Sequence, residues 1–541
     1  MTAAIAVYLL SAILYGCGNK LCIKGSCRNG FGHYKNPEGL IYIGQWKDGL
    51  YEGTGKIRYP DGNIYDGSFS GGKREGVGTM FYPDGGKYSG QWKEGLRSGD
   101  GIYNSPFGER YSCEWIDDRM DGQCSIEYRD GASYEGTFRN GKRNGSGTLI
   151  YPDGKIYRGD FLDNKMHGQG TLIFEDGTEY QGGFTDNKME GKGRITSSDG
   201  TVYTGQVKNG LKSGEGTLIH ADGRKYIGQF SNDIFHGRGK YTLKNGDIYS
   251  GDFQNGSITG KGTMIYTDGG RYTGEFKDSK RHGKGILIRP DGEKYDGQFI
   301  NDISDGKGLV IYPSGIRYKG DWKKGIKEGY GEMTFPDGRS YKGYFTNNEF
   351  NGYGRYNRGD GSVYSGHFKD NGINGKGSIT YGDGRKYTGD WSNGKWDGNG
   401  KLTWPDGKKY EGRFDKGIIS GNGTMYYPDG RIYEGLLKDG IKDGKGKLTW
   451  PDGRSYEGEW ENDEYSGQGK YTFPDGRYYN GQWEKGEYNG YGILIFPDGS
   501  WYEGIWKNSK MHGMGAIKYK NESGKDKVIM EGKWENGMPL D

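Results

Sequence analysis

The chain has 541 residues, of which 31% are hydrophobic, 108 are glycine and 46 are tyrosine. Such a composition cannot fill the several globular cores that a compact protein of this length would need. With 75 Lys and Arg against 72 Asp and Glu, the net charge is +3, which excludes a strongly basic protein that binds nucleic acid through its charge.

Residues 1–16 differ in composition from the rest of the chain. Every residue from Ala3 to Tyr15 is apolar except Ser11. As a helix this stretch would cover only about 20 Å of the roughly 30 Å hydrocarbon core of a bilayer, so its length fits the apolar region of a signal peptide. The sequence L-Y-G-C at residues 14–17 resembles a bacterial lipobox, which implies an exported protein, acylated at Cys17 and anchored in the cell envelope. The alternative is a hydrophobic terminal segment that folds over the first repeat of a cytoplasmic protein.

From Tyr42 to the unit that begins at Tyr502, a 23-residue unit recurs in 21 copies without insertion or deletion, and each copy begins with tyrosine. We number each unit from this anchor tyrosine, at offset 0. Glycine stands at +2 in all copies but one, at +11 in all, and at +13 in all but one; +4 is Trp or Phe except at Val207 and Leu437, and +15 is Ile, Leu, Met, Val or Tyr. Apolar residues and glycine therefore alternate with polar residues in two segments. This pattern predicts two β-strands per repeat, each with one apolar face and one polar, solvent-exposed face.

Two turns separate these predicted strands. Offset +7 is always Gly, Asn, Asp or Ser, the residue types suited to a tight turn. The second segment is followed by Pro-Asp-Gly or a relative of it, as at residues 60–62, and 13 of the 14 prolines occupy this slot. Each repeat is therefore expected to be a β-hairpin, joined to the next by a second turn.

The parity of the pattern suggests a register for the hairpin. We expect +2 to face +13, the anchor tyrosine to face +15, and +4 to face +11. Continued across the second turn, this register would place Trp92 between Gly99 and Gly78. Glycine beside an aromatic ring provides the space that the ring needs in a sheet, so the glycines are predicted to be a packing requirement.

Both ends of the chain keep part of this frame. Residues 17–41 retain Gly30 and Gly32 but lack the aromatic anchors, which predicts an N-terminal cap. After Tyr519 the frame slips by five residues in a charged loop and resumes at residues 530–534 as a half-repeat. Terminal repeats must cover an open sheet edge, so atypical ends are expected. The predicted organisation is a signal peptide at 1–16, an N-terminal cap at 17–41, 21 repeats at 42–519, and a charged loop with a capping half-repeat at 520–541.

The repeat resembles the MORN family, whose motif reads roughly Y-x-G-x-W-x-x-G-x-x-x-G-x-G followed by a D-G turn. The resemblance covers about nine-tenths of the chain. It implies an all-β fold, an elongated single-sheet antiparallel ribbon of hairpins with a groove lined by the tyrosine and tryptophan positions. Representative groove residues are Tyr88, Trp92, Tyr318, Trp322, Tyr387, Trp391, Tyr456, Trp460, Tyr479 and Trp483. MORN repeats serve as scaffolds, as membrane-associated modules and as appendages to unrelated enzymes, so the resemblance by itself leaves the function open.

The five cysteines support export. Cys113 and Cys124 are the sole replacements of the +2 and +13 glycines, and the expected register makes them direct cross-strand neighbours. Together with a possible Cys22 to Cys27 bond, they would form two disulfides and leave Cys17 for lipid. The alternative is that two small buried thiols replaced glycine without forming a bond.

The sequence shows no catalytic constellation. His167, His236, His282 and His512 occupy the same +10 slot, and the nearest two are 46 residues apart. Two repeats correspond to about 19 Å at strand spacing, too far for a shared metal or a proton relay. No nucleotide-binding loop follows a strand. We therefore expect no enzymatic activity, no cofactor and no metal.

Three classes of function remain. The first, which we favour, is a lipid-anchored scaffold that binds a protein partner or another extended ligand along its groove. The second is a protein that binds glycan or cell wall, because rows of aromatic rings can stack on sugars. The third is a phospholipid-associated or cytoplasmic MORN scaffold, although positive charges interleaved with equal negative charges provide no polybasic face for anionic lipid. The sequence predicts no nucleic-acid partner and does not decide the oligomeric state.

Overall fold

The computed structural model describes residues 21–540, which fold into 46 β-strands and contain no helix. No segment of this part of the chain is a helix long and apolar enough to span a membrane. From β3 (Ile41–Lys47) to β43 (Trp501–Lys507), each odd-numbered strand has seven residues and begins one residue before its anchor tyrosine. From β4 (Leu50–Arg58) to β42 (Glu487–Ile495), each even-numbered strand has nine residues and begins at offset +8. The predicted signal peptide and Cys17 lie outside the described residues.

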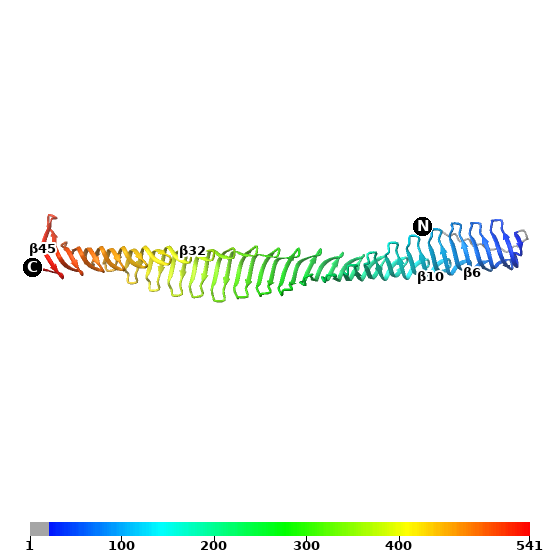
Figure 1. The fold of residues 1–541 in the computed structure, drawn as a ribbon, viewed down its shortest axis with the longest axis horizontal. Helices are drawn as coiled ribbons and strands as arrows, with labels where there is room; N and C mark the ends of the chain where they lie inside the picture. The colour runs from blue at the N-terminus through cyan, green and yellow to red at the C-terminus, as the bar shows by residue number, and fades with distance from the viewer. Residues whose placement is uncertain (1–20, 541) are drawn as a thin grey trace. The chain divides into compact units, whose positions relative to one another are not determined.

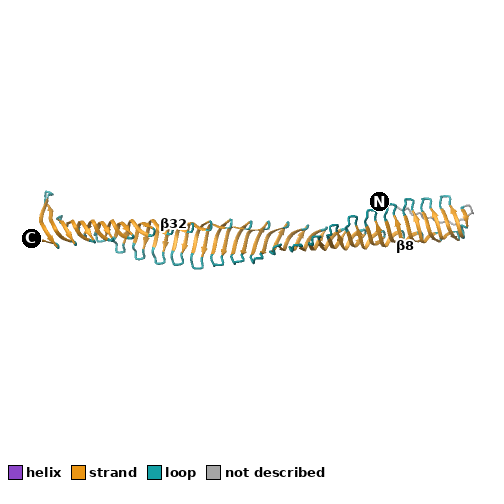
Figure 2. Ribbon diagram, viewed as in Figure 1, coloured by secondary structure: helices purple, strands orange, loops and turns teal. Residues whose placement is uncertain are grey.

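The chain divides into two compact units, Met1–Thr267 and Asp268–Asp541. Within each unit a strand pairs antiparallel with the strands before and after it in sequence, as β4 does with β3 and with β5 (Ile64–Ser70). Figures 1 and 2 show these strands following one another in chain order, joined by turns that lie alternately at one end and the other of the strands. The predicted fold class, an antiparallel all-β sheet with two strands per 23-residue repeat, is confirmed.

The turn inside each hairpin has two residues, and both have positive φ. In the first repeat φ is 51° at Asp48 and 85° at Gly49, and the same pair of values recurs at Glu94 and Gly95 with 51° and 87°. Two consecutive left-handed residues form the type I′ turn, whose twist matches that of the flanking strands. The sequence pattern predicted the left-handed residue at +7. It missed the one at +6, because residues as ordinary as Lys324 adopt that conformation here, with φ of 50°.

The register within the hairpin is partly as predicted. Gly90 pairs with Gly101 and Tyr88 pairs with Tyr103, so +2 faces +13 and offset 0 faces +15. Trp92, however, pairs with Arg97 rather than Gly99. Between the pair Gly90 and Gly101 and the pair Trp92 and Arg97, β8 (Leu96–Asn104) has two more residues than β7 (Lys87–Lys93). This bulge includes the +11 glycine, and it shifts the partner of +4 from +11 to +9.

The expected position of Trp92 beside Gly78 is therefore also wrong. Across the second turn Trp92 pairs with Gly76, while Gly78 pairs with Gly90. The indole still reaches Gly78, because its Nε1 donates a hydrogen bond of 3.1 Å to the Gly78 carbonyl. The paired +2 and +13 glycines instead make room for the anchor tyrosine of their own repeat. A Cβ on Gly101 would lie 2.4 Å from Cζ of Tyr88.

Short hairpins and half-repeats stand at the two ends of the described chain. At the N-terminal end, β1 (Cys22–Gly25) pairs with β2 (Gly30–Lys35), and β2 pairs with β3 in the frame of the repeats, with Gly32 opposite Gly44. At the C-terminal end, β44 (Lys510–Lys520), β45 (Asp526–Glu535) and β46 (Met538–Pro539) follow the last complete hairpin. Trp534 of β45 is buried and donates from Nε1 to the Gly515 carbonyl at 3.3 Å, as seven of the eight +4 tryptophans of the array do to the corresponding glycine.

Candidate binding surfaces

The anchor tyrosines form the core of the sheet. Among residues 21–540, twenty of the 21 anchors donate a hydrogen bond of 2.6–3.2 Å from the phenol to the carbonyl of offset +3 in the same repeat. In most repeats the ring also meets the +4 aromatic of its own repeat edge to face, as in Tyr88 and Trp92, whose ring centroids are 5.2 Å apart. Burial raises the pKa of Tyr134 to about 12.

All ten aromatic residues that were predicted to line a groove are buried in this core. The five tyrosines among them are 0% exposed, and the five tryptophans are 4–9% exposed. A ligand on this face would therefore meet the side chains that cover these rings. The ten residues are Tyr88, Trp92, Tyr318, Trp322, Tyr387, Trp391, Tyr456, Trp460, Tyr479 and Trp483.

The side chains at +9 cover the anchor tyrosines. Because of the bulge, +9 lies opposite the +4 aromatic, and its side chain packs on the anchor ring. Tyr465 stacks on Tyr456 with ring centroids 3.9 Å apart, and Tyr488 stacks on Tyr479 at 3.8 Å. In other repeats the covering group is a cation: the Arg97 guanidinium lies 5.6 Å from the Tyr88 centroid and 4.0 Å from that of Trp115. Sequence reasoning missed this layer, because +9 has no fixed residue type and its position depends on the bulge.

In the second unit this face is rich in half-buried aromatic side chains at +9, +15 and +17. Trp450 lies 6.1 Å from Tyr471, which lies 4.8 Å from Phe473, and Tyr465 lies 5.0 Å from Trp483 (centroid distances). We call the half-buried members between residues 396 and 496 the aromatic strip: Trp396, Trp404, Tyr427, Trp450, Tyr465, Tyr471, Phe473, Tyr488 and Phe496.

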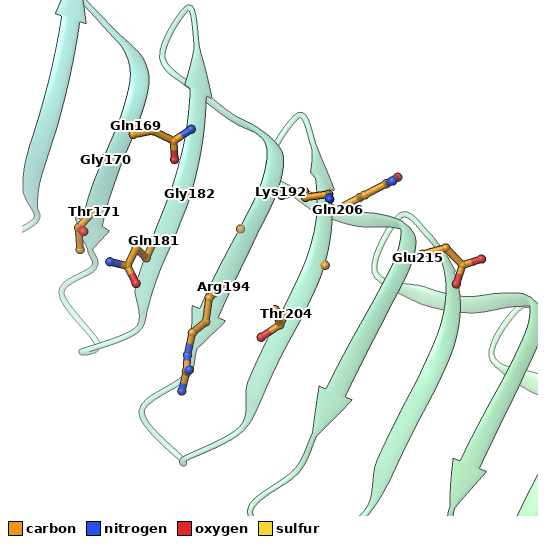
Figure 3. A pocket seen from close by; sticks show the side chains of 12 residues that line it. Gln169, Gly170, Thr171, Gln181, Gly182, Lys192, Arg194, Thr204, Gln206 and Glu215 are labelled. Atoms are coloured by element: carbon orange, nitrogen blue, oxygen red, sulfur yellow. The ribbon is translucent and has the colours of Figure 1, made fainter.

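The opposite face of the sheet is polar and carries a shallow hollow in the first unit. Figure 3 shows its two rows of side chains, one with Gln169, Lys192, Gln206 and Glu215 and the other with Thr171, Gln181, Arg194 and Thr204. The rows correspond to offsets +3 and +12, and to +1 and +14. Paired glycines lie between them, such as Gly170 opposite Gly182, and the hollow measures about 800 Å³. Two parallel polar rows over a glycine floor suit an extended ligand that runs across the strands.

The structure joins Cys113 to Cys124 and Cys22 to Cys27 as disulfides. Cys113 pairs directly with Cys124 across the hairpin, as the +2 and +13 register requires. The disulfide occupies the space that the paired glycines leave for an anchor ring elsewhere. Tyr111 is accordingly only half-buried, and its phenol donates to the Glu109 carboxylate at 2.8 Å instead of to the +3 carbonyl.

The described residues 21–540 contain no group of three or more His, Cys, Asp or Glu side chains that could hold a metal ion. The four +10 histidines lie in four different repeats, and the backbone carbonyl of one of them, His236, accepts a hydrogen bond of 3.4 Å from Tyr226. The many turn aspartates bind backbone amides within their own turn, as Asp153 does for Lys155 at 3.0 Å. These aspartate side chains stabilise the turns, whereas the +10 histidines lie within strands, as His236 does in β20 (Ile234–Thr242).

A model of the MORN repeat matches the chain in 21 successive segments between residues 42 and 523, one for each hairpin described above. The chain belongs to the MORN repeat family. MORN repeats generally form non-enzymatic scaffolds for binding, and the two faces described here are the surfaces that this MORN array offers.

Comparison with curated proteins gives no match for this MORN array. Among solved structures, the TCP domain of SAS-4 from Drosophila melanogaster, in complex with a proline-rich motif, is 17% identical with a TM-score of 0.20, and the match covers 33% of this chain and 90% of that one. The TCP10 domain of CPAP from Danio rerio is 15% identical with a TM-score of 0.18, over 44% of this chain and 96% of that one. PorZ from Porphyromonas gingivalis, a surface component of the type-IX secretion system, is 7% identical with a TM-score of 0.11, over 92% and 80%.

Proposed function

We propose that this protein is a non-enzymatic scaffold that binds a protein partner along the face formed by the +9 side chains and the aromatic strip. The supporting observation is the contrast between positions within the repeat. Offsets 0, +2, +4, +13 and +15 are nearly fixed because the core requires them, and +11 is always glycine because the bulge holds it at positive φ, as at Gly99 with 68°. Offset +9, which covers that core, takes Tyr, Arg, Met, Lys, Phe, Ile, Ser or Trp. The fold therefore leaves +9 free to vary from repeat to repeat, as a recognition surface requires.

The chemistry of this face fits a protein partner. Tyr, Trp and Arg are the residue types that contribute most to protein interfaces, because each combines a large contact area with a polar group. The aromatic strip provides tyrosine and tryptophan side chains, and lysine and arginine side chains border it. Lys408 Nζ, for example, lies 5.1 Å from the Trp404 centroid, and the Arg431 guanidinium lies 4.8 Å from that of Tyr427. A partner with an apolar ridge and acidic flanks would complement this surface.

Site-specific crosslinking tests this proposal. Positions 465 and 468 both lie on β40 (Glu464–Thr472). A photoreactive residue at position 465 is part of the aromatic strip, whereas the same residue at position 468 is on the polar face. We expect the full-length chain in its native host to crosslink one protein from position 465 and not from position 468. Tyr465→Ala should then weaken the binding of that protein by about 2 kcal/mol, or about thirtyfold, while the buried Tyr456 keeps the fold intact. Equal crosslinking from both positions, or an unchanged affinity, would contradict the proposal.

We also propose that the protein is exported and carries a lipid at Cys17. The supporting observation is that the other four cysteines lie as two bonded pairs, one of them at two positions that are otherwise always glycine. Oxidised pairs are typical of compartments outside the cytoplasm. Acyl chains contribute about 0.8 kcal/mol per buried methylene, so two or three of them would anchor the chain durably.

A mass spectrum of the non-reduced protein from its native host tests the export proposal. We expect a chain that begins at Cys17, carries acyl groups and contains two disulfides, and we expect Cys17→Ala to prevent its partition into detergent. Reduction should destabilise the repeat that contains Cys113 and Cys124 by about 3 kcal/mol on the chain-entropy estimate. An intact Met1 with five free thiols would leave the cytoplasmic scaffold as the better reading.

A further inference from the structure

On the polar face of the second unit, four consecutive places in one row hold aromatic residues. Tyr330, Tyr344, Tyr353 and His367 occupy successive places in the row of offsets +3 and +12. In most other repeats this row holds Gln, Lys, Asp, Glu or Asn. The three tyrosines are 45%, 53% and 56% exposed, and His367 is also exposed. We call these four residues the tyrosine row.

The tyrosine row crosses four consecutive strands: β28 (Ile326–Thr334), β29 (Ser340–Thr346), β30 (Glu349–Asn357) and β31 (Val363–Lys369). Tyr330 lies directly opposite Tyr344, with ring centroids 5.4 Å apart, and Tyr353 lies directly opposite His367 at 5.8 Å. Tyr344 also packs against the bulge glycine of the next strand, because a Cβ on Gly352 would lie 3.5 Å from the Tyr344 Cβ. The row thus consists of two ring pairs, one repeat apart.

A second row of charged and hydroxyl side chains runs beside the rings. Glu332 lies opposite Lys342, with 3.8 Å between Oε2 and Nζ, and Arg355 lies opposite Ser365. These residues stand at +14 and +1, two residues along each strand from the tyrosine row, which is about 7 Å. Buried glycine pairs, such as Gly331 with Gly343, separate the two rows. This is the same two-row arrangement as in the hollow of the first unit, with rings in place of one polar row.

We propose that the tyrosine row binds an extended glycan that runs across the strands. The faces of pyranose rings present electron-poor C–H groups, which suit the negative face of an aromatic ring, while sugar hydroxyls need donors and acceptors at the ring edge. The tyrosine row provides the aromatic faces, and the second row, with Glu332, Lys342, Arg355 and Ser365, provides the donors and acceptors. The ring pairs recur every two strands, which is about 9.6 Å, close to the length of a disaccharide unit in an extended β-linked chain.

Several features favour a glycan over a protein on this surface. The rings are flanked in their own row by charged residues, Lys307 with Asp321 on one side and Lys376 with Asp390 on the other, so no aliphatic side chain adjoins the rings within that row. A protein interface of standard size would need a broader apolar centre than four rings in a line. Lys342 and Arg355 outnumber Glu332 in the second row, so the site suits sugars that carry carboxylates as well as neutral sugars.

Titration calorimetry of the full-length chain with two probes tests this proposal: a neutral chito-oligosaccharide and an acidic oligogalacturonate, each of six sugars. We expect at least one of them to bind. Tyr344→Ala combined with Tyr353→Ala should weaken that binding by about tenfold. Both side chains are on the surface, and the hydrogen bond from Tyr341 uses only the Tyr344 backbone carbonyl at 2.8 Å, so the sheet should stay intact by circular dichroism.

Tyr491 provides the matched control. It occupies the same +12 offset and is 46% exposed, but it lies opposite Ile505 rather than a second ring, and its phenol contacts the Glu503 carboxylate. Tyr491→Ala should leave glycan binding unchanged. Binding of the acidic probe alone would assign the site to uronates. Binding of neither probe, or binding that the double variant does not weaken, would overturn the proposal. The proposed protein interface is on the other face, so Tyr465→Ala should change partner binding without changing glycan binding.

Discussion

Replacing Gly400 with valine is expected to open the sheet locally around Tyr387. A Cβ at position 400 would lie 2.5 Å from both Cε2 and the phenol oxygen of Tyr387. The ring cannot move aside, because it is 0% exposed and its phenol donates to the Asp390 carbonyl at 2.8 Å. We expect a cost on the order of 3 kcal/mol, the upper part of the usual range for overpacking. Hydrogen exchange should quicken in β33 (Lys386–Ser392), β34 (Lys395–Thr403) and their neighbours, because each repeat is stabilised mainly by adjacent ones.

Gly532 offers a matched control for this substitution. It pairs with Gly515 in the same way as a +2 glycine, but no atom lies within 4 Å of the Cβ that would be added to it. Gly532→Ala should therefore be nearly neutral, whereas Gly400→Ala should already be destabilising. Replacing Tyr387 with a smaller residue should recover part of the loss in the Gly400 variant. Exchange that quickens equally throughout the second unit would show that the cooperative unit is larger than the repeat.

Raising the pH above 10 is expected to unfold the sheet through its tyrosines. Burial raises the pKa values of Tyr42, Tyr134 and Tyr226 to about 12, compared with about 10 in an unfolded chain. Below pH 10 both states hold the phenol protons, and the contribution of the buried phenols to stability is complete. Between about pH 10 and pH 12 the unfolded chain releases protons that the folded chain retains, so stability falls as pH rises. Since an anchor of this kind recurs in every repeat, the effects add, and circular dichroism should show loss of the sheet by about pH 12.

Tyr134→Phe separates this effect from the titration of lysine side chains. At neutral pH the variant loses the 3.2 Å hydrogen bond from the phenol to the Thr137 carbonyl, which should cost about 1 kcal/mol. Phenylalanine does not titrate, so the variant repeat should lose less stability than the native one above pH 10. The difference in hydrogen exchange between the two proteins should therefore shrink and then change sign as the pH rises. A difference that is constant from pH 7 to pH 12 would show that anchor ionisation does not drive alkaline unfolding.

The sequence predicted the architecture well because the repeat supplies 21 copies of one pattern. Alternation of polar and apolar residues identified both strands, and the left-handed residue types at +7 located the hairpin turn. The register prediction held on the side of the bulge away from the hairpin turn, as in the pair Gly90 and Gly101, and it correctly made Cys113 and Cys124 neighbours. It failed at Trp92, because parity alone cannot detect two extra residues in one strand. An even number of extra residues leaves the alternation of faces unchanged.

The sequence alone determined the repeat unit, its two strands, its turns and the aromatic core, since each depends on contacts that recur within 23 residues. Only the tertiary structure decided which side chains a ligand can meet. It buried Tyr88, Trp92 and the other predicted groove aromatics, placed the variable +9 residues over them, and brought Tyr330 beside Tyr344 and Tyr353 beside His367 on the opposite face. The physical reason is that exposure depends on what packs above a residue. In this sheet the covering side chain comes from across a bulge, or from the next hairpin, at an offset that periodicity does not encode.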